Sequence, residues 1–194
     1  MKIPVYYFKP KVIDPYIFVI YDYKKTQNII KLRKIDFFKD ESDILKHIKD
    51  NKLKLVDNSD QKVYSILLEL RDIINAYLKD GKRNLFKALK EMGISYDLDD
   101  KFNTPFSESV LKALLRIKPG EITTYSDLAK KINSKAYRAV GGVLRNNPLP
   151  LIIPCHRVIK QDGKLGGFMG HLDEDWQINL KRSLLKIEGN IISI

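Results

Sequence analysis

Three segments near the start of the chain combine aromatic and β-branched residues, a composition typical of β-strands. They are residues 5–8, 16–21 and 29–35. Beyond them, residues 63–78 repeat apolar side chains every three or four positions and end at Asp80-Gly81, which predicts a helix. Shorter helices are expected at 43–49 and 85–92. The first hundred residues therefore predict a small antiparallel sheet with helices, and nothing in them suggests chemistry beyond a scaffold.

The helical pattern resumes after an expected linker at 99–103. Thr104 is an N-cap residue, and Pro105 occupies the first position of the helix that follows. Residues 125–145 have the pattern of a helix-turn-helix, and a last amphipathic helix is expected at 176–187. We predict an α+β fold with two domains. The first, 1–100, is a scaffold of sheet plus helices, and the second, 101–194, is mostly helical and contains the helix-turn-helix.

The second helix of that motif, expected at 136–144 with Ser134 as its cap, contains Gly141-Gly142. Each glycine costs about 1 kcal/mol relative to alanine in a helix interior. Either another backbone or a ligand must therefore approach closely. Ala136, Tyr137, Arg138 and Ala139 place small residues beside one arginine, which suits contact with nucleic acid. A helical hairpin packed in the core would show the same spacing.

Charge and composition narrow the classes of function. The chain has 35 Lys and Arg against 24 Asp and Glu, a net charge of +11, which favours a polyanion such as DNA or RNA. A merely basic protein would have the same balance, and the lysines are spread along the chain. We expect no membrane segment and no secretory signal. The single cysteine excludes an intramolecular disulfide and fits a cytoplasmic setting, and the three histidines do not group for metal binding.

Candidate chemistry is concentrated at Cys155, which follows an apolar run and Pro154. A cysteine with an ordinary pKa of about 8.5 is mostly protonated at neutral pH, so a nucleophilic cysteine needs a proton acceptor. His156 is the nearest, and Glu188 is a candidate carboxylate to orient it. The alternatives are a buried structural thiol and an ordinary surface histidine.

The C-terminal half, from about 104 to 189, resembles the O6-alkylguanine-DNA alkyltransferases, also called methylated-DNA–protein-cysteine methyltransferases. The segments that carry the resemblance are Thr104-Pro105-Phe106, Gly120-Glu121-Ile122-Thr123-Thr124-Tyr125, Arg138-Ala139-Val140-Gly141-Gly142, Arg145-Asn146-Asn147-Pro148 and Pro154-Cys155-His156-Arg157-Val158. Their shared order and spacing make the resemblance specific.

The resemblance implies that the helix-turn-helix binds the minor groove of double-stranded DNA carrying O6-alkylguanine. The residues expected to contact DNA are Ala136, Tyr137, Arg138, Ala139, Gly141 and Arg145. Arg138 would fill the gap left by the extruded nucleotide, because the O6 substituent cannot reach a sulfur while the base is stacked. Tyr125 would assist flipping and donate a proton toward N3 of guanine.

The resemblance also implies that Cys155 accepts the alkyl group irreversibly, in a single turnover, with His156, a water and Glu188 as its relay. The residues expected in the pocket or its hinge are Asn147, Arg157, Val158, Phe168 and Met169. Phe168 stands where relatives usually have tyrosine, Met169 replaces a commoner small or polar residue, and the acidic segment 171–175 is longer than expected. No metal and no cofactor are expected.

We expect a cytoplasmic monomer that does not bind membranes and that is associated with the nucleoid in a prokaryote. Three alternatives remain open on the sequence. The first is an alkyltransferase-like protein that binds the lesion without transfer, the second a helix-turn-helix regulator, and the third a cysteine hydrolase.

Overall fold

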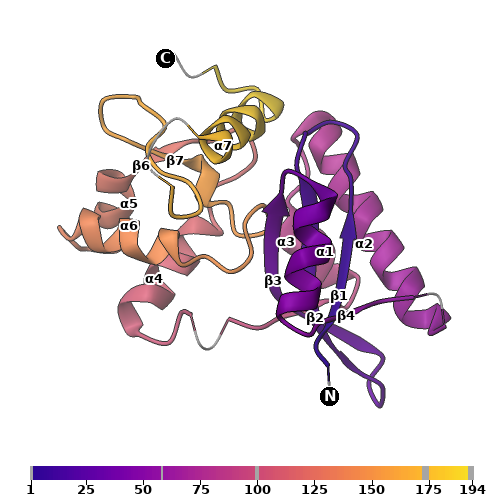
Figure 1. Ribbon diagram of the computed structural model, residues 1–194. Helices are drawn as coiled ribbons and strands as arrows, with labels where there is room; N and C mark the ends of the chain where they lie inside the picture. The colour runs from indigo at the N-terminus through magenta and orange to yellow at the C-terminus, as the bar shows by residue number, and fades with distance from the viewer. Residues whose placement is uncertain (1, 58, 99–100, 172–174, 192–194) are drawn as a thin grey trace.

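The computed structural model describes residues 2–57, 59–98, 101–171 and 175–191, and its N-terminal half is built on a five-stranded sheet (Figure 1). The strand order is β4-β1-β2-β3-β5. The predicted strands are confirmed as β1 (Pro4–Phe8), β2 (Tyr16–Lys24) and β3 (Ile29–Phe38), which pair antiparallel. The edge strands β4 (Lys54–Leu55) and β5 (Ser95–Tyr96) are parallel to their neighbours. These two were not predicted, because two residues are too few to show alternation.

A bulge in β3 keeps its apolar side chains on one face. The register between β2 and β3 passes from Ile20↔Lys34 to Tyr21↔Leu32, so Arg33 has no partner across the ladder. An extra residue on one strand shifts the alternation of its side chains by one position. Ile30 and Leu32 before the bulge, and Ile35 and Phe37 after it, are therefore all buried in the same cluster.

Helices cover both faces of this sheet. Helix α1 (Glu41–Asp50) buries Ile44 against Val5 and Phe18. Helix α2 (Gln61–Asp80) and helix α3 (Leu85–Glu91) bury their apolar stripes on the opposite face, with residues such as Leu70 in the main cluster. Since successive strand residues point to opposite faces, β1 and β2 supply both layers. All three helices were predicted within two residues of their observed ends.

The C-terminal half is mostly helical, as predicted. Its helices are α4 (Pro105–Leu114), α5 (Tyr125–Lys131), α6 (Tyr137–Arg145) and α7 (Trp176–Ile187). A short parallel pair, β6 (Thr123–Thr124) and β7 (Val158–Ile159), and a 3-10 turn, η1 (Cys155–Arg157), complete it. Thr104 begins α4 by accepting a hydrogen bond from the Ser107 backbone at 3.1 Å.

Ser134 does not cap α6 in the way that the sequence suggested. The N-cap position is Ala136, which has no side chain able to cap, and the Ser134 hydroxyl accepts from the Ala136 backbone N–H at 3.0 Å. The hydroxyl therefore stabilises the turn just before the helix rather than the first helical turn itself.

The two halves are in direct contact. The Ile35 backbone N–H, on β3 beyond its pairing with β5, donates to the Pro148 carbonyl at 2.8 Å. Gly81 ends α2 with φ of +66°, and a Cβ there would lie 2.3 Å from the carbonyl oxygen of Ile187 at the end of α7. One buried cluster includes apolar residues of both halves. The division at residue 100 stays a prediction, since residues 99–100 lie outside the described ones.

None of the helices in the described ranges is both long and apolar enough to cross a membrane.

Candidate active site

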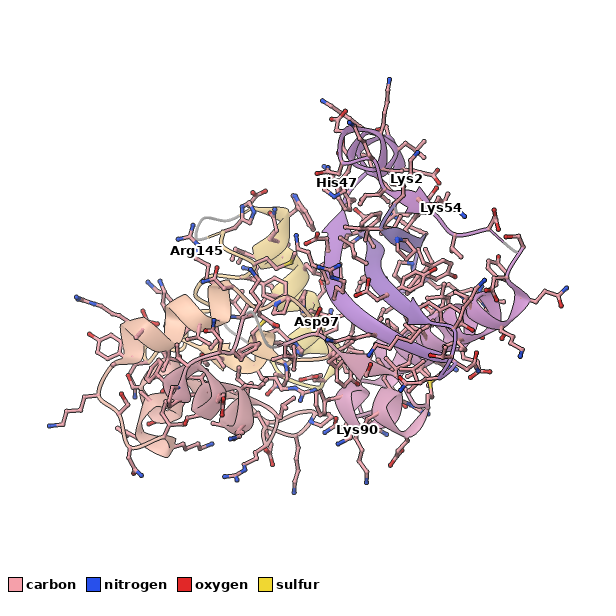
Figure 2. The ribbon with its side chains drawn as sticks, turned by 90° about the horizontal axis from the view of Figure 1, so that it is seen from below. Lys2, His47, Lys54, Lys90, Asp97 and Arg145 are labelled. Carbon is pink, nitrogen blue, oxygen red and sulfur yellow. The ribbon has the colours of Figure 1, made fainter. Side chains whose placement is uncertain are left out.

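A cavity of about 570 Å³ opens in the C-terminal half between α5, α6, η1 and the loop that follows β7. Nine of the residues that the sequence singled out line it: Tyr125, Tyr137, Arg138, Gly141, Gly142, Arg145, Cys155, Phe168 and Met169. Arg145 lies on this half of the molecule, whereas Lys2 and Lys54 lie on the N-terminal half, as Figure 2 shows. The basic charge of the chain is therefore not confined to the cavity.

Cys155 begins the 3-10 turn and is 6% exposed. Its Sγ accepts a hydrogen bond at 3.0 Å from the side-chain amide of Asn147, which also donates to the Ile153 carbonyl at 3.0 Å. Asn147 therefore ties the end of α6 to the turn that carries the cysteine. Burial raises the pKa of the Cys155 thiol, and this outweighs the Asn147 hydrogen bond and the nearby charge of Lys181, which lower it. At rest, the sulfur is a thiol.

His156 and Glu188 form a fully buried pair behind the cysteine. Their Nε2 and Oε1 atoms are 3.2 Å apart, and the ring's Nδ1 has no hydrogen-bond partner among the described residues. Burial lowers the pKa of His156, although Glu188 opposes this shift. The neutral ring therefore leaves a basic nitrogen free for a proton.

Arg157 holds the carboxylate of Glu188 in its charged form. Its guanidinium reaches Oε1 at 2.6 Å and also donates to the Ile117 carbonyl at 2.7 Å. Burial alone would raise the pKa of Glu188, but His156 and Arg157 outweigh it and lower this pKa to about 2. A buried carboxylate needs such a partner, because its loss of hydration is otherwise uncompensated.

The expected place of Arg157 and Val158 in the pocket wall needs correction. Both are buried and neither lines the cavity. Arg157 turns to Glu188 because a buried guanidinium requires an anion, and Val158 pairs with Thr123 in the short parallel sheet. They lie behind Cys155 rather than beside the space that a substrate would occupy.

Tyr77 is a site residue that the sequence did not reveal. Its hydroxyl donates to Glu188 Oε1 at 2.7 Å and lies 3.2 Å from His156 Nε2. It belongs to α2, on the apolar stripe that includes Leu70 and Ile74. In the sequence, a tyrosine at this spacing cannot be told from a packing aromatic.

Lys181 is a second buried residue that the sequence did not reveal. It lies on α7, and its ammonium donates to the carbonyls of Val158 at 2.7 Å, Leu165 at 2.6 Å and Gly167 at 3.2 Å. Burial lowers its pKa to about 8. These bonds fix the loop that leads to Phe168 at the cavity wall.

The ring of Tyr125 lies between two glycines. A Cβ on Gly166 would lie 3.3 Å from the ring and 3.4 Å from its hydroxyl. A Cβ on Gly141 would lie 3.9 Å from a carbon of the ring. Apart from the backbone of α6 itself, the described residues bring only the Tyr125 side chain within 4 Å of a Cβ on Gly141 and no atom within 4 Å of one on Gly142, so no other described backbone packs against this pair and that alternative was wrong. Burial, and then the proximity of Cys155, raise the pKa of Tyr125 to about 12, so its hydroxyl keeps its proton.

The first turn of α6 is exposed. Ala136, Tyr137, Arg138 and Ala139 all face away from the core, whereas Val140 and Leu144 are buried on the other side of the helix. The small residues of this turn therefore do not pack in the core, whereas the opposite side of α6 does. The exposed side of α6 adjoins the cavity through Arg138 and Arg145.

Phe168 and Met169 form a tight turn at the cavity. Phe168 and His171 exchange two backbone hydrogen bonds of 3.0 Å, and Met169 between them has a positive φ of 52°. Of the acidic segment 171–175, residues 172–174 lie outside the described ones.

The sequence of this chain is similar to those of known proteins. Residues 105–190 match the family described as 6-O-methylguanine DNA methyltransferase, DNA binding domain. A Methanosarcina mazei methylated-DNA–protein-cysteine methyltransferase is 50% identical over 88 residues, 45% of this chain and 52% of that protein. This chain therefore spans about half the length of the Methanosarcina relatives it matches. The protein of the same name from Thermococcus kodakarensis is 32% identical over 160 residues, which are 82% of this chain and 84% of that one.

Solved structures agree on the fold. The O6-methylguanine-DNA methyltransferase of Pyrococcus kodakaraensis superposes with a TM-score of 0.61 at 25% identity, over 96% of this chain and 99% of that one. A Mycobacterium tuberculosis OGT crystallised in complex with DNA gives a TM-score of 0.60 at 24% identity, over 96% of this chain and 92% of that one. With the identity to the Thermococcus protein extending over most of both chains, the chain belongs to the methylated-DNA–protein-cysteine methyltransferase family.

Proposed function

We propose that this protein repairs DNA by moving the alkyl group of O6-alkylguanine onto Cys155, irreversibly and once per molecule. The observation that carries the proposal is the position of the Cys155 sulfur. It is a buried thiol at the wall of a cavity of about 570 Å³ that also borders an exposed helix-turn-helix. A base swung out of a duplex would enter such a cavity, whereas a stacked base could not bring its O6 substituent to the sulfur.

The exposed face of α6 supports binding in the minor groove of double-stranded DNA. Ala136, Ala139 and Gly141 allow close approach, and Tyr137, Arg138 and Arg145 supply polar and charged contacts. Arg138, at the cavity rim, is proposed to occupy the space of the extruded nucleotide. The net charge of +11 adds attraction to DNA that does not depend on sequence.

The transfer begins with the loss of the Cys155 proton, since burial keeps the sulfur a thiol. We assign the acceptor as His156 Nδ1, reached through a water, with Nε2–H donated to Glu188. The thiolate then attacks the alkyl carbon, the carbon–O6 bond breaks, and its electron pair goes to the purine. Tyr125, which is protonated at rest, donates its proton to N3 so that a neutral guanine leaves, and the proton that His156 took from Cys155 then returns to the Tyr125 oxygen through solvent.

The other residues of the site shape and position the reaction. Asn147 holds the sulfur and is the proposed hinge between α6 and the turn. Phe168 and Met169 are proposed to wall the pocket, while Arg157 and Val158 act from behind it. The thioether product leaves no route back to the thiol, so one protein repairs one lesion. We further propose that the protein acts as a cytoplasmic monomer, associated with the nucleoid in a prokaryote.

A titration of the protein against a duplex carrying one O6-methylguanine with a labelled methyl group tests this function. We expect one equivalent of label on the Cys155 peptide and then no further reaction. Cys155→Ala should transfer nothing, yet bind the duplex with an unchanged Kd, because the buried thiol is not among the exposed α6 residues proposed to contact DNA. Repeated turnover would indicate a hydrolase, and tight binding of the lesion without label on Cys155 would indicate a lesion binder. Binding to one DNA sequence in preference to all others would indicate a regulator.

A further inference from the structure

One side chain of the N-terminal half reaches the buried pair behind Cys155. Tyr77 lies in the last turns of α2, well before the segment 105–190 that matches the family's DNA-binding domain. It is fully buried, and its hydroxyl contacts both His156 and Glu188. The scaffold proposed for the first hundred residues therefore contributes one polar group directly to the relay.

The hydrogen-bonding roles of these three groups follow from charge. Glu188 is ionised, because Arg157 pairs with it at 2.6 Å, and an ionised carboxylate only accepts. His156 Nε2, at 3.2 Å from Oε1, must then carry the proton. Tyr77 has one proton, and the 2.7 Å contact directs it to Glu188. Its oxygen lone pairs are left to face the Nε2–H of His156.

We propose that Tyr77 is a positioning residue for alkyl transfer, which bridges Glu188 and His156 and fixes the imidazole with Nε2 protonated and Nδ1 free. This inference rests on the proposed function of Cys155. When His156 takes the thiol proton, the imidazolium needs acceptors for Nε2–H, and the Tyr77 oxygen supplies one besides the carboxylate. No bond to Tyr77 is made or broken, and its own proton stays on the hydroxyl.

The surrounding groups support this role. Burial, and then the charge of Glu188, hold the pKa of Tyr77 well above its usual value, so its hydroxyl keeps its proton at neutral pH. Several charged or titratable groups face the cysteine and its relay. They are Arg157 on η1, Lys181 on α7, Glu188 directly after α7, and Tyr125 on α5. Lys160, on the loop after β7, acts on Lys181. All of them remain when Tyr77 is replaced by phenylalanine.

The test measures the reactivity of the cysteine apart from DNA. Because the chain has one cysteine, the rate of its modification by iodoacetamide at each pH reports Cys155 alone. In Tyr77→Phe the imidazolium loses an acceptor, so the relay takes the proton less readily. We expect the apparent pKa of Cys155 to rise by at least about half a unit. Alkyl transfer at saturating DNA should slow by roughly tenfold while the Kd stays within about twofold.

Tyr96→Phe is the matched control. Its hydroxyl is also bonded in the N-terminal half, to the Phe86 carbonyl at 2.8 Å, and it does not touch the relay. This variant should show the wild-type pH profile and transfer rate. A Tyr77→Phe profile that coincides with wild type, or that shifts to lower pH, would overturn the inference. If the wild-type protein gains no label on Cys155 from the methylated duplex, the proposed function fails. The iodoacetamide profiles would still test whether Tyr77 bridges Glu188 and His156.

A measurement on the unaltered protein covers the case in which Tyr77→Phe does not fold. A proton–nitrogen correlation spectrum of the histidine side chains at neutral pH should show His156 with the proton on Nε2. The buried hydroxyl proton of Tyr77 should show a nuclear Overhauser effect to this Nε2 proton. The opposite tautomer, with the proton on Nδ1, would refute the bridge.

Discussion

The N-terminal half, up to residue 98, buries apolar and aromatic side chains between its sheet and helices, whereas the C-terminal half also buries polar and charged ones. In the part of the chain that the structure describes, all seven buried polar or charged residues follow residue 100: Ser107, Thr123, His156, Arg157, Gln177, Lys181 and Glu188. Hydrophobic burial tolerates approximate fits, but a buried charge requires a partner at a defined distance. The structure of the C-terminal half therefore depends on particular pairs of buried polar or charged groups. Several of these groups belong to the candidate site.

Removing Arg157 should show the largest effect of this difference. Arg157→Ala leaves the Glu188 carboxylate buried without its cation, and breaking such a pair costs about 3–5 kcal/mol. The measurement is the free energy of unfolding in urea. The control in the N-terminal half is Arg33→Ala, whose ion pairs with Asp22 and Asp97 are partly exposed and should contribute at most about 1 kcal/mol. Equal losses in the two variants would mean that burial does not distinguish the halves.

Acid should weaken the C-terminal half through Glu188. Its pKa is about 2 in the folded protein against an ordinary 4.5, so the unfolded chain binds more protons between these values. The contribution of ionised Glu188 to the free energy of unfolding is on the order of 3 kcal/mol. It is fully present above about pH 5 and is lost as the pH falls toward 2. Urea unfolding at several pH values, compared with Glu188→Gln, measures it.

The free energy of unfolding of Glu188→Gln should depend less on pH than that of the wild type between about pH 5 and 2. Local hydrogen bonds also lower the pKa values of Asp57, which is exposed, and of Asp127, which is partly exposed, but both residues are present in the wild type and in the variant. If the wild type and Glu188→Gln lose stability in parallel, the carboxylate is not the group responsible.

Arg138 belongs to the same half as Arg157 and is also charged, but it is exposed. Arg138→Ala should leave the free energy of unfolding within about 0.5 kcal/mol of wild type. It should slow repair of duplex DNA by at least roughly tenfold, because unstacking a base costs a few kcal/mol. The reaction with free O6-benzylguanine needs no flipping and should keep its rate. Equal slowing of both reactions would remove Arg138 from the flipping step.

Periodicity was enough to predict most of the fold. The spacing of Trp176, Leu180, Leu184 and Ile187 predicted helix α7 with the ends that the structure has. The strands β4, β5, β6 and β7 are each two residues long, so their pairing depends on tertiary contacts that no local pattern records. The sheet was therefore predicted without its parallel edges.

The candidate site was predicted only where residues adjoin in sequence or match the family's motifs. Cys155, Tyr125 and Arg138 all line the cavity, and their roles stay predictions. Tyr77 and Lys181 were missed because a tyrosine on an apolar stripe and a lysine on an amphipathic helix ordinarily pack or face solvent. Their roles depend on partners as far as 111 residues away, as between Tyr77 and Glu188.

The close approach of Gly81 to the end of α7 limits how this protein can be recombined with its relatives. Any side chain there would collide with main-chain atoms of Ile187 and displace the neighbouring Glu188. A chimaera that joins this C-terminal half to another N-terminal half must therefore supply a glycine at the equivalent point, or Glu188 will be displaced from His156.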